Sequence, residues 1–301
     1  MEVPNYEETL QSLNSCLSQI KWRFKSTSKR RLEIDVLALC TGMRPVVMID
    51  YGGKMPELQD RLLALLGLMH KESPMFKELR VMVIEDMIYL INVRSFSEYI
   101  TSSFSLDAKL FFVDLEHDPP KMIEQSKESK LGMQLISIQK LFSSAFPLEG
   151  GNSNTLACES TNHMAILDSS TSEASSSQSS LFHDLSRCLQ DTQITIPTLN
   201  GWLLGYPVVY LFGKDHIEDA IYNLSTKSLR IFRILVSRNM DSHFEELTSF
   251  SVPYDLSMGG RDEPWAEAFL GRMRLKWEEC KHVWTSLELE VSECYPQAIV
   301  L

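Results

Sequence analysis

The segment Pro45-Val46-Val47-Met48-Ile49-Asp50 decides the fold class of this chain. It is a short, continuous apolar run, which is typical of a β-strand that is buried on both faces. Tyr51-Gly52-Gly53 ends the run, and Leu58, Leu62 and Leu65 follow with the spacing of an amphipathic helix. A buried strand followed by an amphipathic helix predicts an α/β fold.

The same alternation continues through the first half of the chain. Apolar runs predict strands over 79–84, 87–93 and 110–114, and helical spacing predicts helices over 95–103 and 131–142. Strands that alternate with helices usually form a sheet with parallel neighbours. We therefore predict a mixed sheet that is partly parallel in the N-terminal half and flanked by helices.

The second half of the chain is richer in strands. Apolar or alternating segments predict strands over 207–212, 229–237, 248–252 and 287–291, and the segment 220–224 is expected to pair back onto the first of them. Consecutive strands of this kind pair antiparallel, so the C-terminal half of the sheet is predicted to be antiparallel. A long helix is predicted from Pro264, with an apolar stripe from Trp265 to Trp284.

A serine-rich stretch lies between the two halves. Residues 168–180 are almost entirely Ser, Thr, Asp, Glu, Gln and Ala, and they contain nothing that could form a core. Such a composition cannot offset the entropy of ordering the chain, so we predict a disordered insert over residues 148–180. Neither half alone resembles a closed sheet. Residues 1–301 are therefore expected to form a single mixed α/β domain that contains the insert.

Composition and charge restrict the class of protein. The 301 residues carry a net charge of −11, which opposes broad attraction to nucleic acid and to anionic membranes. No apolar run approaches the ~20 residues of a membrane span, and the acidic N-terminus does not resemble a secretory signal. Six cysteines without a C-x-x-C pair suggest a reducing compartment. We expect a soluble protein of the cytoplasm, with the nucleus as an alternative.

The basic residues concentrate in one place, Lys21–Lys25 and Lys29–Arg31, where aromatic residues are interleaved. This pattern could form a nuclear-import or nucleic-acid patch. On an acidic protein, a solvated helix end and loop is the favoured interpretation.

Two aspartates are the sharpest chemical candidates, because each one ends an apolar strand. Asp50 precedes Tyr51-Gly52-Gly53, and Asp114 precedes Leu115-Glu116-His117-Asp118. If the two strands were parallel neighbours, both carboxylates would face one crevice and could hold Mg²⁺. The alternative is that each aspartate caps the turn that follows it, which we favour. Beyond this candidate metal, the sequence leaves the cofactor unknown.

The other candidate sites in the sequence have less support. A haloacid-dehalogenase-type phosphatase would need an aspartate where Gly52 stands, and Gly52-Gly53 is too short for a phosphate-binding loop. Glu116-His117-Asp118 is expected to be a solvated loop. Cys280 lies on the apolar stripe of the final helix, so a buried, inert thiol is favoured over a nucleophile paired with His282.

The segments Gly201-Trp202-Leu203-Leu204-Gly205-Tyr206-Pro207-Val208 and Ser249-Phe250-Ser251-Val252-Pro253 resemble an uncharacterised family of animal proteins. That family is named only after an open reading frame on human chromosome one, and its domain is of unknown function. The resemblance implies one conserved unit and transfers no catalytic residue or cofactor. From the residues themselves, we interpret 201–207 as a packed turn, with Leu203 and Leu204 in the core, rather than a ligand loop.

Two functions of different class remain. The first, which we favour, is a non-catalytic interaction protein with a protein partner that the sequence does not identify. The second is a metal-dependent enzyme that acts on a phosphorylated or anionic substrate through Asp50 and Asp114.

Overall fold

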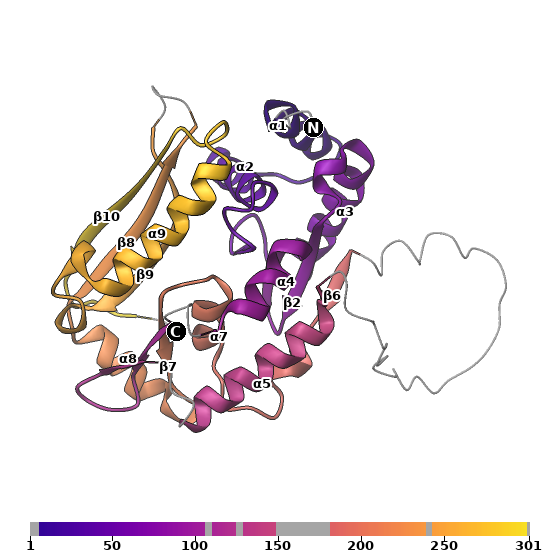
Figure 1. Cartoon of the computed structure of the whole chain (residues 1–301). Coiled ribbons are helices and arrows are strands. Elements are labelled where there is room, and N and C mark those ends of the chain that lie inside the picture. The colour runs from indigo at the N-terminus through magenta and orange to yellow at the C-terminus, as the bar shows by residue number, and fades with distance from the viewer. Residues whose placement is uncertain (1–5, 106–109, 125–128, 149–180, 239–242, 300–301) are drawn as a thin grey trace, which may run out of the picture.

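The computed structural model describes residues 6–105, 110–124, 129–148, 181–238 and 243–299 (Figure 1). These residues form a mixed α/β fold with three sheets. The helices are α1 (Tyr6–Ser18), α2 (Ser26–Cys40), α3 (Glu57–Glu72), α4 (Val93–Ser102), α5 (Lys130–Ala145), α7 (Ile196–Leu203), α8 (Ile217–Ser225) and α9 (Pro264–Glu279). No helix within these ranges is long and apolar enough to cross a membrane.

The four-stranded sheet has the order β1-β3-β2-β6. Its strands are β1 (Val46–Met48), β2 (Leu79–Ile84), β3 (Met87–Asn92) and β6 (Phe182–Asp184). Successive side chains point to opposite faces of a strand, so Val47 and Leu90 join a core with α2 and α3, whereas Val46 and Tyr89 join a second core with α4, α5 and α7. Both faces are therefore covered, as the unbroken apolar runs predicted.

The other two sheets have three strands each. The small sheet has the order β5-β4-β7 and contains β4 (Phe111–Asp114), β5 (Lys121–Glu124) and β7 (Val208–Leu211). The C-terminal sheet has the order β10-β8-β9 and contains β8 (Leu229–Ser237), β9 (Glu245–Pro253) and β10 (Ser286–Cys294). Helix α9 lies along this last sheet (Figure 1), where Trp265 packs edge-on against Phe232 and Phe250.

The predicted fold class is confirmed, although the strands divide among three sheets. The C-terminal sheet is antiparallel throughout, as expected. The parallel pairs are β2 with β6 and β4 with β7, so each joins a strand from before the serine-rich stretch to one from after it. The predicted disordered insert over 148–180 lies, apart from Leu148, outside the residues that the structure describes.

Three local predictions were wrong. The segment 220–224 is helical, because Ala220, Asn223 and Leu224 are buried with the spacing of one helix face. The segment that begins at Gly201 is still helix, and α7 ends only at Leu203. The final helix stops at Glu279, so Trp284 reaches the core from beyond the helix, where its indole Nε1 donates a hydrogen bond to Thr41 Oγ1 at 3.2 Å.

Candidate anion-binding pocket

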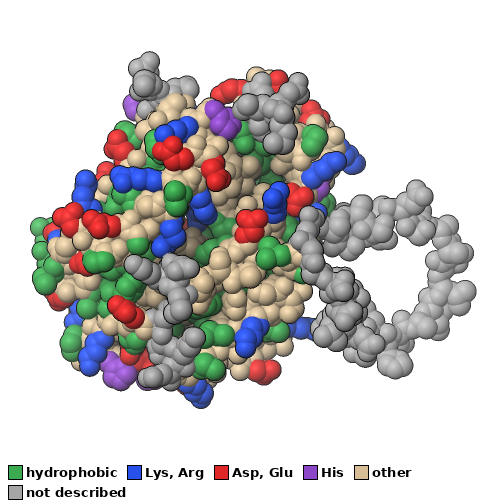
Figure 2. All heavy atoms as spheres, viewed as in Figure 1, with side chains coloured by type: hydrophobic (Ala, Val, Ile, Leu, Met, Phe, Trp, Pro, Cys, Tyr) green, Lys and Arg blue, Asp and Glu red, His purple; other side chains and the backbone are tan. Residues whose placement is uncertain are grey.

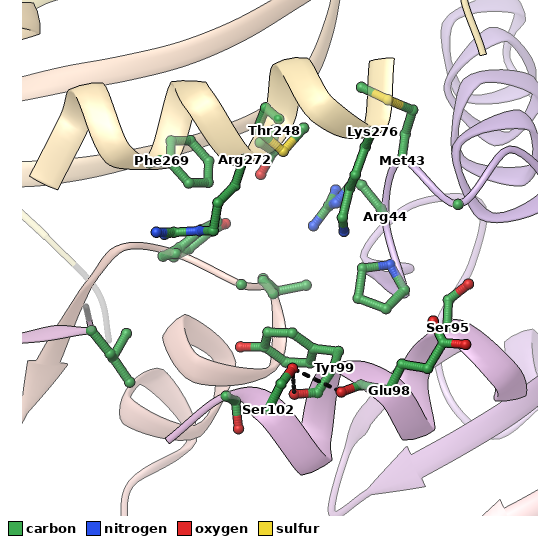
Figure 3. A pocket seen from close by; sticks show the side chains of 18 of the residues that line it. Met43, Arg44, Ser95, Glu98, Tyr99, Ser102, Thr248, Phe269, Arg272 and Lys276 are labelled. Carbon is green, nitrogen blue, oxygen red and sulfur yellow. Dashed lines mark hydrogen bonds between the residues drawn. The ribbon is translucent and has the colours of Figure 1, made fainter. Parts of the chain in front are cut away.

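A pocket of about 580 Å³ lies between α4 and α9. Two loops complete its wall, Gly42–Pro45 after α2 and Leu204–Tyr206 after α7. Figure 3 shows the side chains of α9 and of the first loop facing those of α4 across the cavity. Leu110 and Thr248 add to the lining, so the pocket is assembled from segments in both halves of the chain.

Each helix contributes one face to the pocket. Helix α9 presents Phe269, Arg272, Met273 and Lys276, with the acidic Glu279 at its end, and helix α4 presents Ser95, Glu98, Tyr99 and Ser102. Both sets follow the spacing i, i+3, i+4 and i+7, which places all four side chains on one face of a helix. One wall is therefore apolar and cationic, and the opposite wall is rich in hydroxyl groups.

A third cation enters from the loop after α2. That helix ends at Cys40, and Gly42 has a φ of 72°, the left-handed conformation that reverses the chain without steric cost. Arg44 follows with only 6% of its surface exposed, and its Nη1 donates a hydrogen bond to the carbonyl of Leu247 at 3.1 Å. The guanidinium of Arg44 is therefore held in place by β9.

The same stretch of β9 also anchors a buried ion pair on α2. Arg31 Nη1 donates a hydrogen bond to the carbonyl of Glu246 at 2.6 Å, and its Nη2 lies 3.0 Å from Asp35 Oδ1. Tyr51 donates a hydrogen bond to Asp35 Oδ2 at 2.7 Å. This network joins α2 and the loop after β1 to the C-terminal sheet, and Arg44 lies beside it.

The three cations of the pocket have no close acidic partner. Within the described ranges, no carboxylate oxygen lies within 4.0 Å of a side-chain nitrogen of Arg44, Arg272 or Lys276. Glu98 lines the pocket but pairs with Arg94 at 3.5 Å. Figure 2 shows Lys and Arg side chains on this face where α9 approaches α4.

Burial acts on all three cations, and repulsion by the two arginines acts on Lys276. Burial lowers the pKa values of Arg44, Arg272 and Lys276, because each charge loses contact with water. The pKa of Lys276 is lowered further by Arg44 and Arg272, against a smaller opposing effect of Glu98 and Glu279. Arg272 and Lys276 are also four residues apart on one helix, a spacing at which like charges destabilise the helix. An anion between the three groups would relieve all of these costs.

The segment that carries the family resemblance both packs and lines the pocket. Trp202 and Leu203 are fully buried, and Tyr99 donates its hydroxyl hydrogen to the carbonyl of Trp202. The expectation that Leu204 also lies in the core was wrong, because Leu204 is half-buried and lines the cavity. Gly205, with a φ of 76°, turns the chain at this point.

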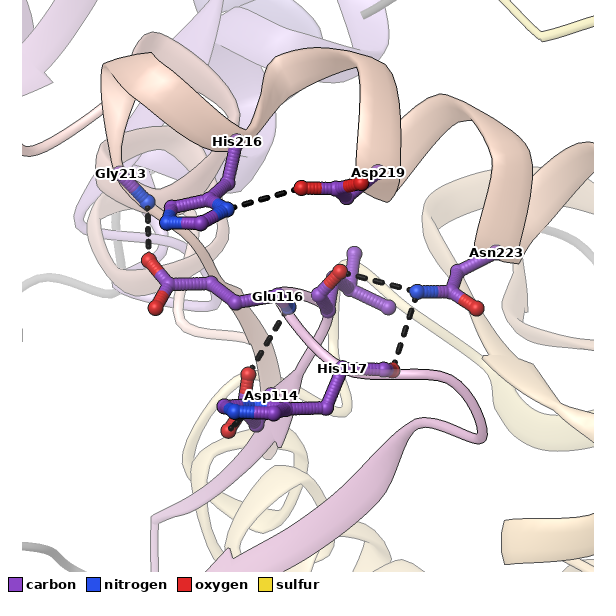
Figure 4. A network of polar contacts seen from close by, with 8 residues as sticks. Asp114, Glu116, His117, Gly213, His216, Asp219 and Asn223 are labelled. Carbon is purple, nitrogen blue, oxygen red and sulfur yellow. Dashed lines mark hydrogen bonds and ion pairs between the residues drawn. The ribbon is translucent and has the colours of Figure 1, made fainter.

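The two predicted site aspartates do not lie on neighbouring strands. Asp50 is exposed and follows β1 in the four-stranded sheet, whereas Asp114 ends β4 in the small sheet. The condition for a shared ion, parallel neighbouring strands, is therefore not met. Asp114 instead caps the next turn, accepting a hydrogen bond from the backbone N–H of Glu116 at 2.9 Å and contacting His117 Nδ1 at 3.1 Å (Figure 4). A shared magnesium site at Asp50 and Asp114 stays a prediction that the strand order does not support.

The loop after β4 is tied to β7 and α8. Glu116 Oε1 accepts a hydrogen bond from the backbone N–H of Gly213 at 2.8 Å, and Asn223 Nδ2 donates to the carbonyls of Leu115 and His117, both at 3.0 Å (Figure 4). Within the described ranges, no group of three or more His, Cys, Asp or Glu residues is placed to hold a metal. We therefore regard these contacts as structural.

Cys280 is buried, as predicted. Its Sγ donates a hydrogen bond to the carbonyl of Lys276 at 3.2 Å, and burial raises the pKa of the thiol to about 11. A thiol of this kind is protonated at neutral pH and is a poor nucleophile.

The pocket cations were missed in the sequence. Arg272 and Lys276 share a helix face with Phe269 and Met273, and a basic pair at i and i+4 beside an apolar stripe was a visible signal. Arg44 gave no such signal, because its burial depends on contacts with a strand some 200 residues later.

Comparison with known proteins gives one match. A family model described as "Domain of unknown function (DUF4504)" matches residues 14–301. No curated protein and no solved structure matches the chain. The match spans nearly the whole sequence, so the chain belongs to the DUF4504 family, a family of unknown function.

Proposed function

We propose that this protein binds a small anionic molecule, with a phosphate or carboxylate group, in the pocket between α4 and α9. The observation that carries the proposal is the group Arg44, Arg272 and Lys276, which line one cavity without a close carboxylate among the described residues. Guanidinium groups match the geometry of phosphate and carboxylate, and a cation that has lost part of its contact with water is stabilised by an anionic partner.

The remaining walls indicate what the rest of the ligand contains. Ser95, Tyr99 and Ser102 line the wall opposite the cations, and Met43 and Phe269 contribute apolar surface. The Tyr99 and Ser102 hydroxyl groups already donate to the carbonyls of Trp202 and Glu98, so Ser95 is the hydroxyl group that we assign to the ligand. A cavity of about 580 Å³ is in the range of small-molecule sites. The ligand therefore has a polar part opposite its anionic group and a modest apolar part.

This proposal retains one element of each function considered from the sequence. It keeps the anionic ligand of the enzyme hypothesis but places it in a pocket that neither Asp50 nor Asp114 lines. It is also compatible with a non-catalytic role, because ligand binding alone requires no reaction.

Thermal unfolding with inorganic pyrophosphate tests the proposal. A ligand at 100 times its Kd stabilises a folded protein by about 2.7 kcal/mol, so we expect a clear rise in Tm for the wild-type protein. Arg272→Gln should lose most of that rise. Arg274→Gln is the matched control, since Arg274 is exposed on the same helix and does not line the cavity. An equal rise in all three proteins would mean that pyrophosphate acts elsewhere, and the proposal would be wrong.

A further inference from the structure

Lys276 differs from the other two pocket cations because it can lose its charge. Arginine stays protonated at every pH that a protein tolerates, whereas a lysine amine becomes a nucleophile once it is neutral. Lys276 lies one helical turn from Arg272 on α9, and both Arg44 and Arg272 are close enough to lower its pKa. A single amine thus shares the cavity with two permanent cations.

Two observations argue against a purely structural role for this amine. No carboxylate oxygen of the described residues lies within 4.0 Å of its Nζ, so it is not the partner of an ion pair in that part of the chain. The surroundings also favour the neutral form. The charged groups that act on Lys276 are Arg44, Arg272, Glu98 and Glu279, and the two arginines add to the effect of burial in lowering its pKa. A lysine that is desolvated, or that lies next to another cation, is a recognised nucleophile.

We propose that Lys276 forms an imine with an anionic aldehyde or ketone whose charged group is held by Arg44 and Arg272. This inference rests on the anion site proposed above and specifies its ligand as a carbonyl compound. The amine nitrogen attacks the carbonyl carbon, and a C–N bond forms. The carbonyl oxygen then leaves as water, taking one hydrogen from nitrogen and one proton from solvent. The protonated imine keeps the second hydrogen of the amine, so atoms and charge balance without an oxidant or reductant.

The arrangement explains why two arginines and a lysine share one cavity. The arginines bind the anionic end of the ligand, and its charge is then satisfied without the amine. Lys276 therefore need not stay protonated to bind the ligand. An imine withdraws electrons from the neighbouring carbon, so the reactions open to such a site are those that break a bond next to a carbonyl group.

Reductive trapping of an aldehyde phosphate tests the inference. The full-length protein is incubated with pyridoxal 5′-phosphate at neutral pH and reduced with sodium borohydride, and the modified lysines are identified by peptide mass spectrometry. Lys281 is the internal reference, because it is exposed and lies just beyond the same helix. We expect labelling of Lys276 to exceed that of Lys281 by about tenfold or more, because burial and the two arginines lower the pKa of Lys276 and so raise the fraction of neutral amine. Inorganic pyrophosphate should suppress the labelling of Lys276 and leave that of Lys281 unchanged.

A variant separates this inference from the anion site itself. Lys276→Arg keeps the positive charge and removes the nucleophile. Pyrophosphate should therefore still raise the Tm of this variant, but no borohydride-trapped adduct should form at position 276. Equal labelling of Lys276 and Lys281 in a wild-type protein that pyrophosphate stabilises would overturn the imine and leave the anion site standing. Failure of pyrophosphate both to stabilise the wild-type protein and to protect Lys276 would overturn both.

Discussion

At the scale of single residues, the fold buries charged side chains of both signs. The chain carries a net charge of −11, yet Arg44 and Asp35 are both almost fully buried where α2 meets β9. Burying a charge is costly unless partners satisfy it. Asp35 has Arg31 and Tyr51 as direct partners. Arg44 donates to a backbone carbonyl, lines the cavity, and lies close enough to Asp35 to counter the rise that burial causes in the pKa of that carboxyl. We therefore assign a structural role to Asp35 and propose a ligand-binding role for Arg44.

The structural role of Asp35 can be measured. Asp35→Ala removes the carboxylate and leaves Arg31 and Arg44 without it, so we expect a loss of about 3 kcal/mol of unfolding free energy. This value is at the low end for a broken buried pair because the Arg31 side chain is 33% exposed. The double variant Asp35→Ala/Arg31→Met should lose less than the sum of the two single variants. Strict additivity in denaturant melts would show that the pair does not act as a unit.

At the scale of elements, prediction succeeded where a local pattern determines the structure. The strands β2, β3, β4 and β8 were predicted within one or two residues, because their apolar runs are continuous and lie between clear turns. Helix α8 was predicted as a strand because the five residues 220–224 fit both the two-residue period of a strand and the 3.6-residue period of a helix. Its burial at positions 220, 223 and 224 becomes evident only from the sheet and loop that it covers.

The pocket could be predicted only in part for a related reason. Each helix face that forms it is visible in the sequence, but α4 and α9 are separated by more than 160 residues. Their meeting depends on tertiary packing, which no local pattern specifies. The same holds for Asp50 and Asp114, whose expected proximity assumed one continuous sheet rather than three.

The turn after α7 provides a matched pair of neighbouring leucines. Leu203 is fully buried, whereas Leu204 is half-buried and lines the pocket. Leu203→Ala should therefore lower the unfolding free energy by about 2–5 kcal/mol, the usual range for a buried leucine. Leu204→Ala should cost clearly less and change ligand affinity instead. Denaturant midpoints that fall equally in both variants would contradict this division between core and cavity.

At the scale of the whole molecule, the two halves of the chain are joined by strand pairing. Strand β2 pairs with β6, and β4 pairs with β7, across the serine-rich stretch between them. Arg31 of α2 and Arg44 of the loop that follows it also donate hydrogen bonds to β9. These contacts are consistent with one cooperative unit formed by both halves.

Cutting the chain tests this unity. A specific protease site placed within residues 168–180 would separate the backbone into two fragments. We expect the fragments to stay together on size-exclusion chromatography and to unfold in one transition, because strand pairs and a shared core hold them. Two fragments that elute apart without denaturant would show that the halves are separate domains.

The central claim is that the pocket between α4 and α9 binds an anion through Arg44, Arg272 and Lys276. Isothermal titration of inorganic pyrophosphate tests it most directly, with the wild-type protein, Arg272→Gln and the surface control Arg274→Gln compared at low and physiological salt. We predict one binding site in the wild-type and control proteins, with an affinity at least tenfold weaker in Arg272→Gln, about 1.4 kcal/mol. The absence of saturable binding to the wild-type protein at low salt, or equal affinity in Arg272→Gln and Arg274→Gln, would contradict the claim.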